Sequence, residues 1–164
     1  DHRDLHSFPT RRSSDLLVLN LNNPTSMKKS VISVIIAGIL VLLVSMGILY
    51  TAIFFFPTLM EEYYNAVFRS SSFETDWLFY AHPFVLSIAL RWFWERYKDL
   101  FKGGVVIRAL EVALVYGIVA MVPVLWLTFS AIDISFVMIS TWLGYGIAQS
   151  FIAGIVFASM DSKV

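Results

Sequence analysis

The chain has 164 residues, which is room for one domain. Hydrophobic residues make up 58% of it and charged residues only 15%, whereas a soluble domain is about half apolar with about a quarter of its residues charged. This excess of apolar residues indicates that lipid replaces water over much of the surface. Twelve basic and twelve acidic residues give a net charge of zero, which does not favour binding to nucleic acid. The absence of cysteine excludes disulfides, thiolate metal sites and dithiol redox chemistry.

Residues 1–26 differ from the rest of the chain, because they are polar and have neither helical nor strand periodicity. The thirteen residues 4–16 resemble the translated sequence of a common short-read sequencing adapter. We therefore treat 1–26 as an artefact or disordered segment outside the fold, and we expect the authentic chain to start at Met27. The apolar run that follows is too long for the roughly 7–15 residues of a signal-peptide core, so we expect it to stay in the membrane.

Four apolar stretches follow, at about 31–56, 77–94, 105–129 and 134–158. A bilayer core of about 30 Å needs about 20 helical residues, so three of these stretches are long enough to cross it and 77–94 is short. Short links between the last three predict that they are antiparallel neighbours. The sequence thus predicts an all-α fold for 27–164, an integral membrane four-helix bundle with up-down-up-down connectivity.

The distribution of charge orients these spans. Two lysines precede the first span, and the link between the first two spans is mainly acidic. The region joining the second and third spans carries five basic residues, namely Arg91, Arg96, Lys98, Lys102 and Arg108. Because basic connections stay in the cytoplasm, both ends of the chain should lie there, as expected of a multi-pass protein of the bacterial inner membrane. Aromatic residues at both ends of 77–94 agree with this orientation, namely Trp77, Phe79, Tyr80, Trp92, Trp94 and Tyr97.

The segment 57–69 has apolar residues at helical spacing with Glu61 and Glu62 on the other side. Pro57 suits the first turn of a helix, where its missing N–H is not needed. The pattern predicts a short amphipathic helix that lies in the outer interface after the first span. A lid over a cavity is the functional alternative.

Small residues recur at helical spacing in the last two spans and predict close helix packing. They are Ala109, Ala113 and Gly117 in the third span and Gly146, Ser150, Gly154 and Ala158 in the fourth. We favour packing within one chain, and homo-oligomerisation through the last span is the alternative. Pro123 leaves a carbonyl without its helical partner and is expected to kink the third span.

Two ionisable residues fall within predicted spans, where a charge is costly and needs a partner. Arg91 and Glu111 are each ten residues from Phe101, so an antiparallel hairpin that turns there would bring them to the same depth. We expect a buried ion pair between Arg91 and Glu111, with Arg108 as a competing partner for the carboxylate. A proton or cation site at Glu111 is the functional alternative.

Three further polar residues lie within spans, namely His82, Gln149 and Tyr116. We expect hydrogen bonds between helices from them rather than ligand binding. A single histidine in the apolar region cannot supply paired haem ligands, and no carboxylates are spaced around it for a metal. No serine has a His/Asp partner at a suitable depth, so the sequence predicts neither an enzyme nor a cofactor.

The region from Met27 onward resembles small four-span bacterial membrane proteins that form a family of unknown function. The resemblance rests on Met27-Lys28-Lys29, Leu49-Tyr50, the acidic and aromatic stretch Met60–Tyr64, and Gly144, Gly146 and Gly154. It implies the topology and no activity. We therefore expect a structural or interaction protein of the membrane. A small transporter or channel that uses Glu111 is the alternative, and its substrate is not readable from the sequence.

Overall fold

The computed structural model describes residues 24–65, 67–68 and 72–161. Nearly all of the predicted artefact segment 1–26 therefore lies outside the described residues. The chain divides into two compact units, 1–32 and 33–164, and every contact discussed below lies within 33–164. The described part of the first unit is the beginning of helix α2.

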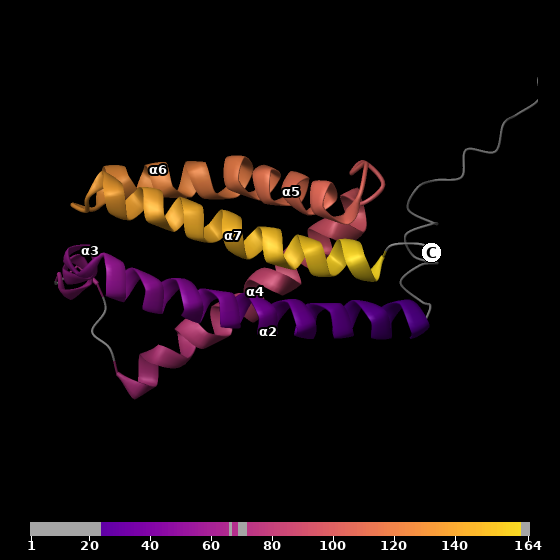
Figure 1. The fold of residues 1–164 in the computed structure, drawn as a ribbon, viewed down its shortest axis with the longest axis horizontal. Coiled ribbons are helices and arrows are strands. Elements are labelled where there is room, and N and C mark those ends of the chain that lie inside the picture. Colours follow the sequence, from indigo (N-terminus) through magenta and orange to yellow (C-terminus); the bar gives the residue numbers. More distant parts are fainter. Residues whose placement is uncertain (1–23, 66, 69–71, 162–164) are drawn as a thin grey trace, which may run out of the picture. The chain divides into compact units, whose positions relative to one another are not determined.

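Every element in the described residues is helical, which confirms the predicted all-α fold (Figure 1). In chain order the elements are α2 (Pro24–Phe55), α3 (Pro57–Glu61), the 3-10 turn η1 (Glu62–Tyr64), α4 (Phe73–Tyr97), α5 (Val105–Tyr116), the π-helical turn η2 (Gly117–Met121), α6 (Val122–Ala131) and α7 (Phe136–Met160).

Three of the four long helices are apolar enough to cross a membrane: Met27–Phe55, Val105–Ala131 and Phe136–Met160. They confirm the first, third and fourth predicted spans. Helix α4 is as long as α7, with 25 residues, but it carries charged side chains towards both ends. Its composition alone therefore does not classify it as a span. The chain is thus a multi-span helical membrane protein with four long helices.

Two helices begin earlier than the apolar pattern predicted. α2 begins at Pro24 rather than near Val31, and α4 begins at Phe73 rather than near Trp77. The difference arises because hydropathy marks the part of a helix that suits lipid, whereas backbone hydrogen bonding continues through polar residues beyond it.

Helix α7 is the centre of the packing, since both α5 and α4 pack against it. α5 and α7 approach closely at Gly154, where an added Cβ would lie 2.9 Å from the backbone Cα of Ala109. Two residues of the predicted packing stripes therefore lie against each other within one chain.

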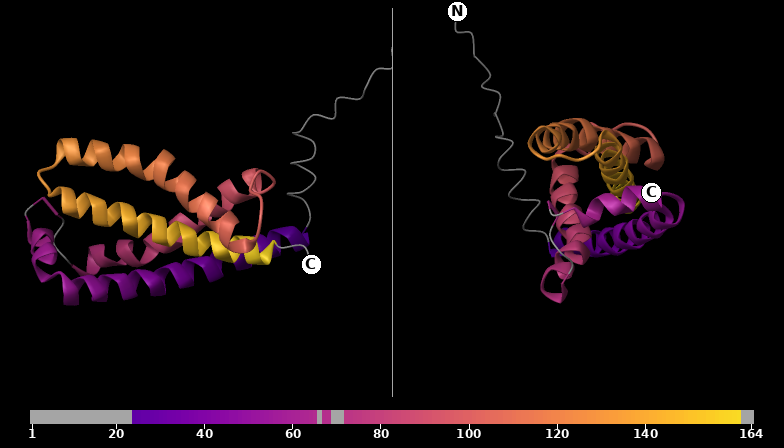
Figure 2. Two further views of the ribbon diagram at one scale, coloured as in Figure 1. Left: turned by 45° about the horizontal axis from the view of Figure 1, so that its top comes forward. Right: turned by 90° about the vertical axis from the view of Figure 1, so that its left-hand side faces the viewer.

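Helices α4 and α5 are joined by a short link but share no extensive contact. α4 runs obliquely across α7 (Figures 1 and 2), so the prediction that the second and third spans pack as antiparallel neighbours is wrong. A short link brings only two helix ends together. The crossing angle is set by side-chain packing along the helices, which here favours α7 as the partner of both.

Candidate functional site

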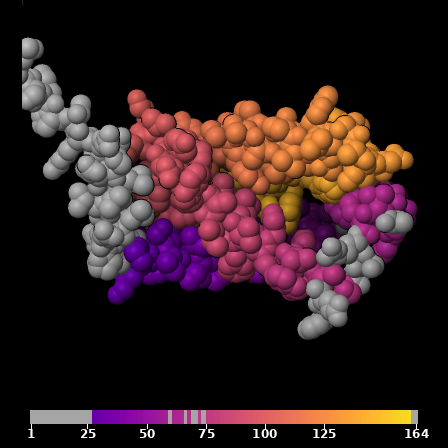
Figure 3. All heavy atoms as spheres, turned by 180° about the vertical axis from the view of Figure 1, so that it is seen from behind, coloured from indigo at the N-terminus to yellow at the C-terminus, as the bar shows by residue number. Residues whose placement is uncertain are grey.

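A cavity of about 920 Å³ lies among α2, α4, α5, α6 and α7. Its lining is mainly apolar, and no Asp, Glu, Lys or Arg is among the described residues that line it. Its polar members come from several helices and from η1, namely Thr51, Tyr63, His82, Tyr116, Thr141, Trp142, Tyr145 and Gln149. Figure 3 shows the molecule hollowed between α4 and α6, with α7 at the bottom of the hollow. Concave, mainly apolar pockets of about 300–1,000 Å³ with a few polar groups are typical of small-molecule sites.

Glycines leave part of this space open. A Cβ added at Gly47 on α2 or at Gly144 on α7 would meet no atom within 4 Å, and both glycines line the cavity. Gly146 acts differently, because an added Cβ there would lie 2.6 Å from Cε of Met121. The side chain of Met121 therefore reaches the backbone of α7 and forms one wall of the cavity.

The third span is interrupted by the π turn η2, which carries Met121. The N–H of Val122 donates to the carbonyl of Gly117, five residues earlier. In a regular α-helix the ring of Pro123 would clash with the carbonyl four residues before it, and the wider π turn relieves this clash. The proline was visible in the sequence, whereas the π turn that precedes it was not.

Gln149 forms a polar contact in the wall of the cavity. Its side chain is 1% exposed, and its Nε2 donates a 2.9 Å hydrogen bond to the hydroxyl of Ser45 on α2. The predicted role of Gln149 as a bridge between helices matches this contact.

His82 on α4 and Tyr116 on α5 also line the cavity. In the described part of the chain neither side chain has a hydrogen-bond partner, in contrast to the prediction that both bridge helices.

One end of the cavity is closed by the segment after α2. Trp142 Nε1 on α7 donates a 2.6 Å hydrogen bond to the hydroxyl of Tyr63, and the ring of Phe68 packs on both. Burial raises the pKa of Tyr63 above its ordinary value, and the hydrogen bond from Trp142 opposes this rise.

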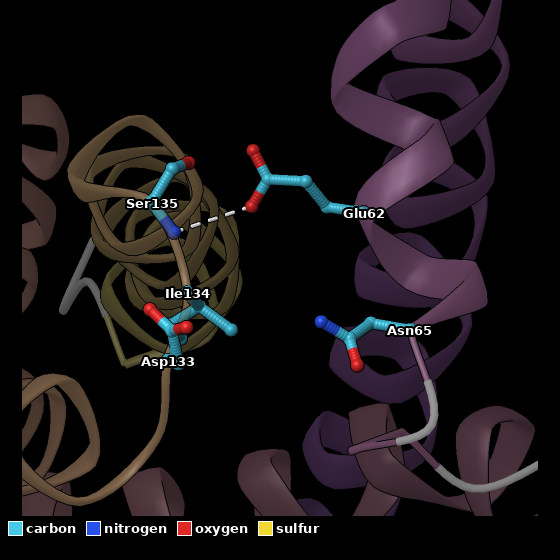
Figure 4. Close-up of a pocket in the computed structure, with 5 residues that line it drawn as sticks. All are labelled: Glu62, Asn65, Asp133, Ile134 and Ser135. Atoms are coloured by element: carbon cyan, nitrogen blue, oxygen red, sulfur yellow. Dashed lines mark hydrogen bonds between the residues drawn. The ribbon is translucent and has the colours of Figure 1, made fainter.

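A second contact attaches the same segment to α7. The carboxylate of Glu62 accepts a 3.2 Å hydrogen bond from the N–H of Ser135, just before α7 begins (Figure 4). These two residues, with Asn65, Asp133 and Ile134, border a small polar hollow of about 340 Å³. No group of three metal-ligating side chains occurs in the part of the chain that the structure describes.

The predicted amphipathic helix over 57–69 is shorter in the structure. The helical turns end at Tyr64, and Asn65 has extended backbone with its side chain accepting a hydrogen bond from the N–H of Val67. Asparagine commonly ends helices in this way, because its side chain replaces a backbone acceptor two residues on. Arg69, the predicted end, lies outside the described residues.

Near the C-terminal end of α4, Arg91 is buried and forms an ion pair with Glu95 and a second one, at 3.1 Å, with Asp161. Asp161 also accepts a 2.8 Å hydrogen bond from Nε1 of Trp94. The sequence analysis treated Trp94 as an interfacial aromatic, whereas its side chain is buried in this cluster. The i,i+4 spacing of Arg91 and Glu95 was a usable signal. Nothing in the sequence indicated Asp161.

The structure does not bring Arg91 and Glu111 together as an ion pair. Among the described residues Arg91 has the two partners on α4 and at the end of α7, while Oε2 of Glu111 is buried without a hydrogen-bond partner. The guanidinium of Arg108 lies 4.7 Å from the ring centroid of Trp94 and does not pair with the carboxylate of Glu111. The expected pairing depended on extensive packing of α4 against α5 along their lengths, whereas the two helices have few contacts.

The small residues of the two predicted packing stripes lie in contacts within the chain, as the favoured prediction of close helix packing has it. Gly117, Gly146 and Gly154 are each in contact distance of a side chain or backbone on the facing helix, as the space around their Cα atoms shows. Ala113, Ser150 and Ala158 are likewise buried.

Comparison with known proteins gives no match to a family model, to a curated protein or to a solved structure.

Proposed function

We propose that this chain is a four-span protein of the bacterial inner membrane that binds an uncharged, lipid-soluble molecule in its cavity. The observation that carries the proposal is the cavity of about 920 Å³, whose described lining is mainly apolar and contains no charged residue. A binding role is a form of the interaction function that the composition favours.

In this proposal α4 also crosses the membrane, as the second of four spans. Exposed aromatic residues lie towards both of its ends, Trp77 and Tyr80 at one and Trp92 and Tyr97 at the other, as is typical of helices anchored at two interfaces. The charge of Arg91 is compensated by two carboxylates near the end of the helix, which lowers the cost of placing it there. Alternating basic connections then put both chain ends in the cytoplasm.

The cavity favours a neutral ligand. A charged group moved from water into an apolar site loses several kcal/mol of hydration unless an opposite charge replaces it. Arg91 and Glu111, the ionisable residues of the predicted spans, are not among the residues that line the cavity. The opening between α4 and α6 would admit a molecule from the bilayer, where neutral apolar compounds concentrate (Figure 3).

Binding rather than catalysis is proposed, because the lining offers no nucleophile with a base beside it. His82 is the one histidine among the described lining residues, and none of the others is a carboxylate that could act with it. No cofactor is invoked.

The proposal is tested with substitutions that fill the cavity with a large side chain. Gly144→Phe and Gly47→Phe each place a ring in open space, and Gly104→Phe is the matched control, since it too has open space around it but lies outside the cavity. The proteins are reconstituted in liposomes and photolabelled with a hexadecane that carries a diazirine. Labelled peptides are then identified by mass spectrometry.

The wild type and Gly104→Phe should show labelling of the 44–52 and 141–149 peptides that excess unlabelled hexadecane suppresses. Gly144→Phe and Gly47→Phe should lose this saturable fraction while keeping the diffuse labelling of lipid-facing residues. Saturable labelling that survives both cavity-filling substitutions would contradict the proposal.

One observation favours the second candidate, a small transporter. Oε2 of Glu111 is buried in a membrane helix without a hydrogen-bond partner among the described residues, as a site for a proton or cation would require. Under this alternative Glu111→Gln abolishes proton-coupled flux in proteoliposomes. Under the binding proposal it leaves cavity labelling unchanged.

A further inference from the structure

We infer that the segment 57–65 is a lid that closes one end of the proposed binding cavity to water. Two hydrogen bonds hold the lid against α7 and the residue before it, one between Tyr63 and Trp142 and one between Glu62 and Ser135. The inference rests on the proposed binding function and adds how access to that site is controlled.

The first hydrogen bond lies at the edge of the cavity itself. Tyr63 and Trp142 both line the cavity, and the indole Nε1 of Trp142 donates to the hydroxyl of Tyr63 at 2.6 Å. Phe56, the residue directly before the lid, is also part of the lining. Separation of Tyr63 from Trp142 would therefore remove part of the wall and open the cavity at this end.

The second hydrogen bond attaches the lid at the start of α7. The carboxylate of Glu62 accepts a 3.2 Å hydrogen bond from the N–H of Ser135, and Figure 4 shows it reaching towards this residue across a small hollow. A negative charge is favoured at this position, because the N-terminal end of a helix carries a partial positive charge. The two polar contacts come from consecutive residues of the turn η1, so they hold the same short piece of chain.

The turn η1 can leave α7 without disturbing the hydrophobic core. None of its three residues is buried. The helix α3 before it has five residues, and helices this short are not stable by themselves, so the conformation of the lid depends on its contacts with the rest of the protein. Segments with few buried apolar contacts open at a much lower free energy than the whole protein unfolds. The lid can therefore open while the long helices stay packed.

The experiment measures how fast a water-soluble reagent reaches a thiol inside the cavity. The chain has no cysteine, so Gly144→Cys introduces a single thiol, at a position that lines the cavity and has open space around it. The protein is placed in lipid nanodiscs, which expose both faces of the bilayer to the reagent. A methanethiosulfonate that carries a sulfonate, and so does not enter lipid, is added, and mass spectrometry follows the modified fraction with time.

Each hydrogen bond of the lid is removed by one substitution with a matched neighbour as control. Glu62→Ala and Tyr63→Phe remove the bonds. Glu61→Ala and Tyr64→Phe make the same chemical changes at adjacent residues whose side chains have no hydrogen bond or ion pair in the described part of the chain. A second thiol, Ala153→Cys in the buried core of α7, is introduced separately and reports any loosening of the whole bundle.

With the lid intact, the thiol of Gly144→Cys should react slowly. Glu62→Ala and Tyr63→Phe should each accelerate its modification by about two- to tenfold, the change in the open fraction that loss of one hydrogen bond produces. The double variant should react faster than either single one. Glu61→Ala and Tyr64→Phe should leave the rate unchanged, and none of the four substitutions should accelerate modification of Ala153→Cys.

Three results would overturn the inference. The first is a rate at Gly144→Cys that does not differ between the lid variants and their controls. The second is equal acceleration at Ala153→Cys, which would show that the whole bundle had loosened. The third is a rate in the otherwise unchanged protein as fast as that of Tyr64→Cys, whose position is 89% exposed, since the cavity would then be open to water with the lid in place.

Photolabelling with the diazirine-bearing hexadecane separates this inference from the proposed function. Saturable labelling of the cavity peptides together with thiol rates that ignore the lid variants would mean that the lid inference fails alone. Absence of saturable labelling together with rates that rise in Glu62→Ala and Tyr63→Phe would mean that the binding proposal fails alone.

Discussion

Gln149 on α7 donates its side-chain amide to the hydroxyl of Ser45 on α2, in a buried hydrogen bond of 2.9 Å. The two residues are 104 positions apart, and the contact joins the first and last long helices at the wall of the cavity.

We expect Ser45→Ala to lower the free energy of unfolding by about 1 kcal/mol, since interhelical hydrogen bonds in membrane proteins contribute about 0.6 kcal/mol on average and up to about 2. Unfolding of the detergent-solubilised protein by SDS measures this. Ser140→Ala is the matched control, because the exposed Ser140 bonds only to the carbonyl of Phe136 in its own helix. Equal effects of the two substitutions would contradict the assignment.

The buried Arg91 should be the most sensitive charged residue of α4. Arg91→Gln removes the guanidinium that Glu95 and Asp161 share, although Lys98 stays near both carboxylates, and it should reduce stability by about 1–3 kcal/mol. Arg96→Gln, which removes an exposed cation lying over the ring of Trp92, should cost less than about 1 kcal/mol.

Exchanging the charges of Arg91 and Glu111 tests whether these two residues interact. The double substitution Arg91→Glu with Glu111→Arg should not restore stability, because Arg91 pairs with Glu95 and Asp161. Expression level and SDS unfolding of the single and double variants report this. Full recovery in the double variant would show that Arg91 and Glu111 interact after all.

Close packing of α5 on α7 predicts opposite effects for two glycines of α7. Gly154→Ala places a Cβ 2.9 Å from the backbone of Ala109 and should destabilise the protein by about 1–3 kcal/mol, as overpacking does. Gly144→Ala meets no atom within 4 Å and should be neutral or slightly stabilising, since alanine favours the helix. Unfolding midpoints of the two variants, measured side by side, should move in different directions.

The raised pKa of Tyr63 predicts a pH dependence at the end of the cavity. Above pH 10 the unfolded chain loses this proton first, because its tyrosine titrates near the ordinary value of 10.0. The folded protein then binds more protons than the unfolded one, so stability falls as the pH rises from 10 towards the raised pKa. Below pH 10 this contribution is fully present.

Unfolding free energies of the wild type and Tyr63→Phe, measured from pH 8 upward, isolate this contribution. The difference between them should be constant below pH 10 and should shrink above it, since only the wild type loses stability through Tyr63. A difference that stays constant to the highest pH would show that Tyr63 does not titrate differently in the two states.

The all-α fold and three spans could be predicted from the sequence, because length and hydropathy along a helix are local properties. The small-residue spacing also indicated the face of α7 that receives Ala109. The ion-pair partner of Arg91 could not be predicted in the same way, since equal distance from Phe101 sets depth in a hairpin and does not make two helices pack. Glu95, one turn away on the same helix, was the partner that local spacing could have identified.

The sequence by itself determined that the chain is a membrane protein and which of its stretches are apolar enough to cross a bilayer. Only the tertiary structure decided that α4 crosses α7 obliquely, that a π turn precedes Pro123, and that His82 and Tyr116 face a common cavity. The reason is physical. Partition into a bilayer depends on the composition of one segment, whereas a cavity depends on how side chains of five helices fail to fill the space between them.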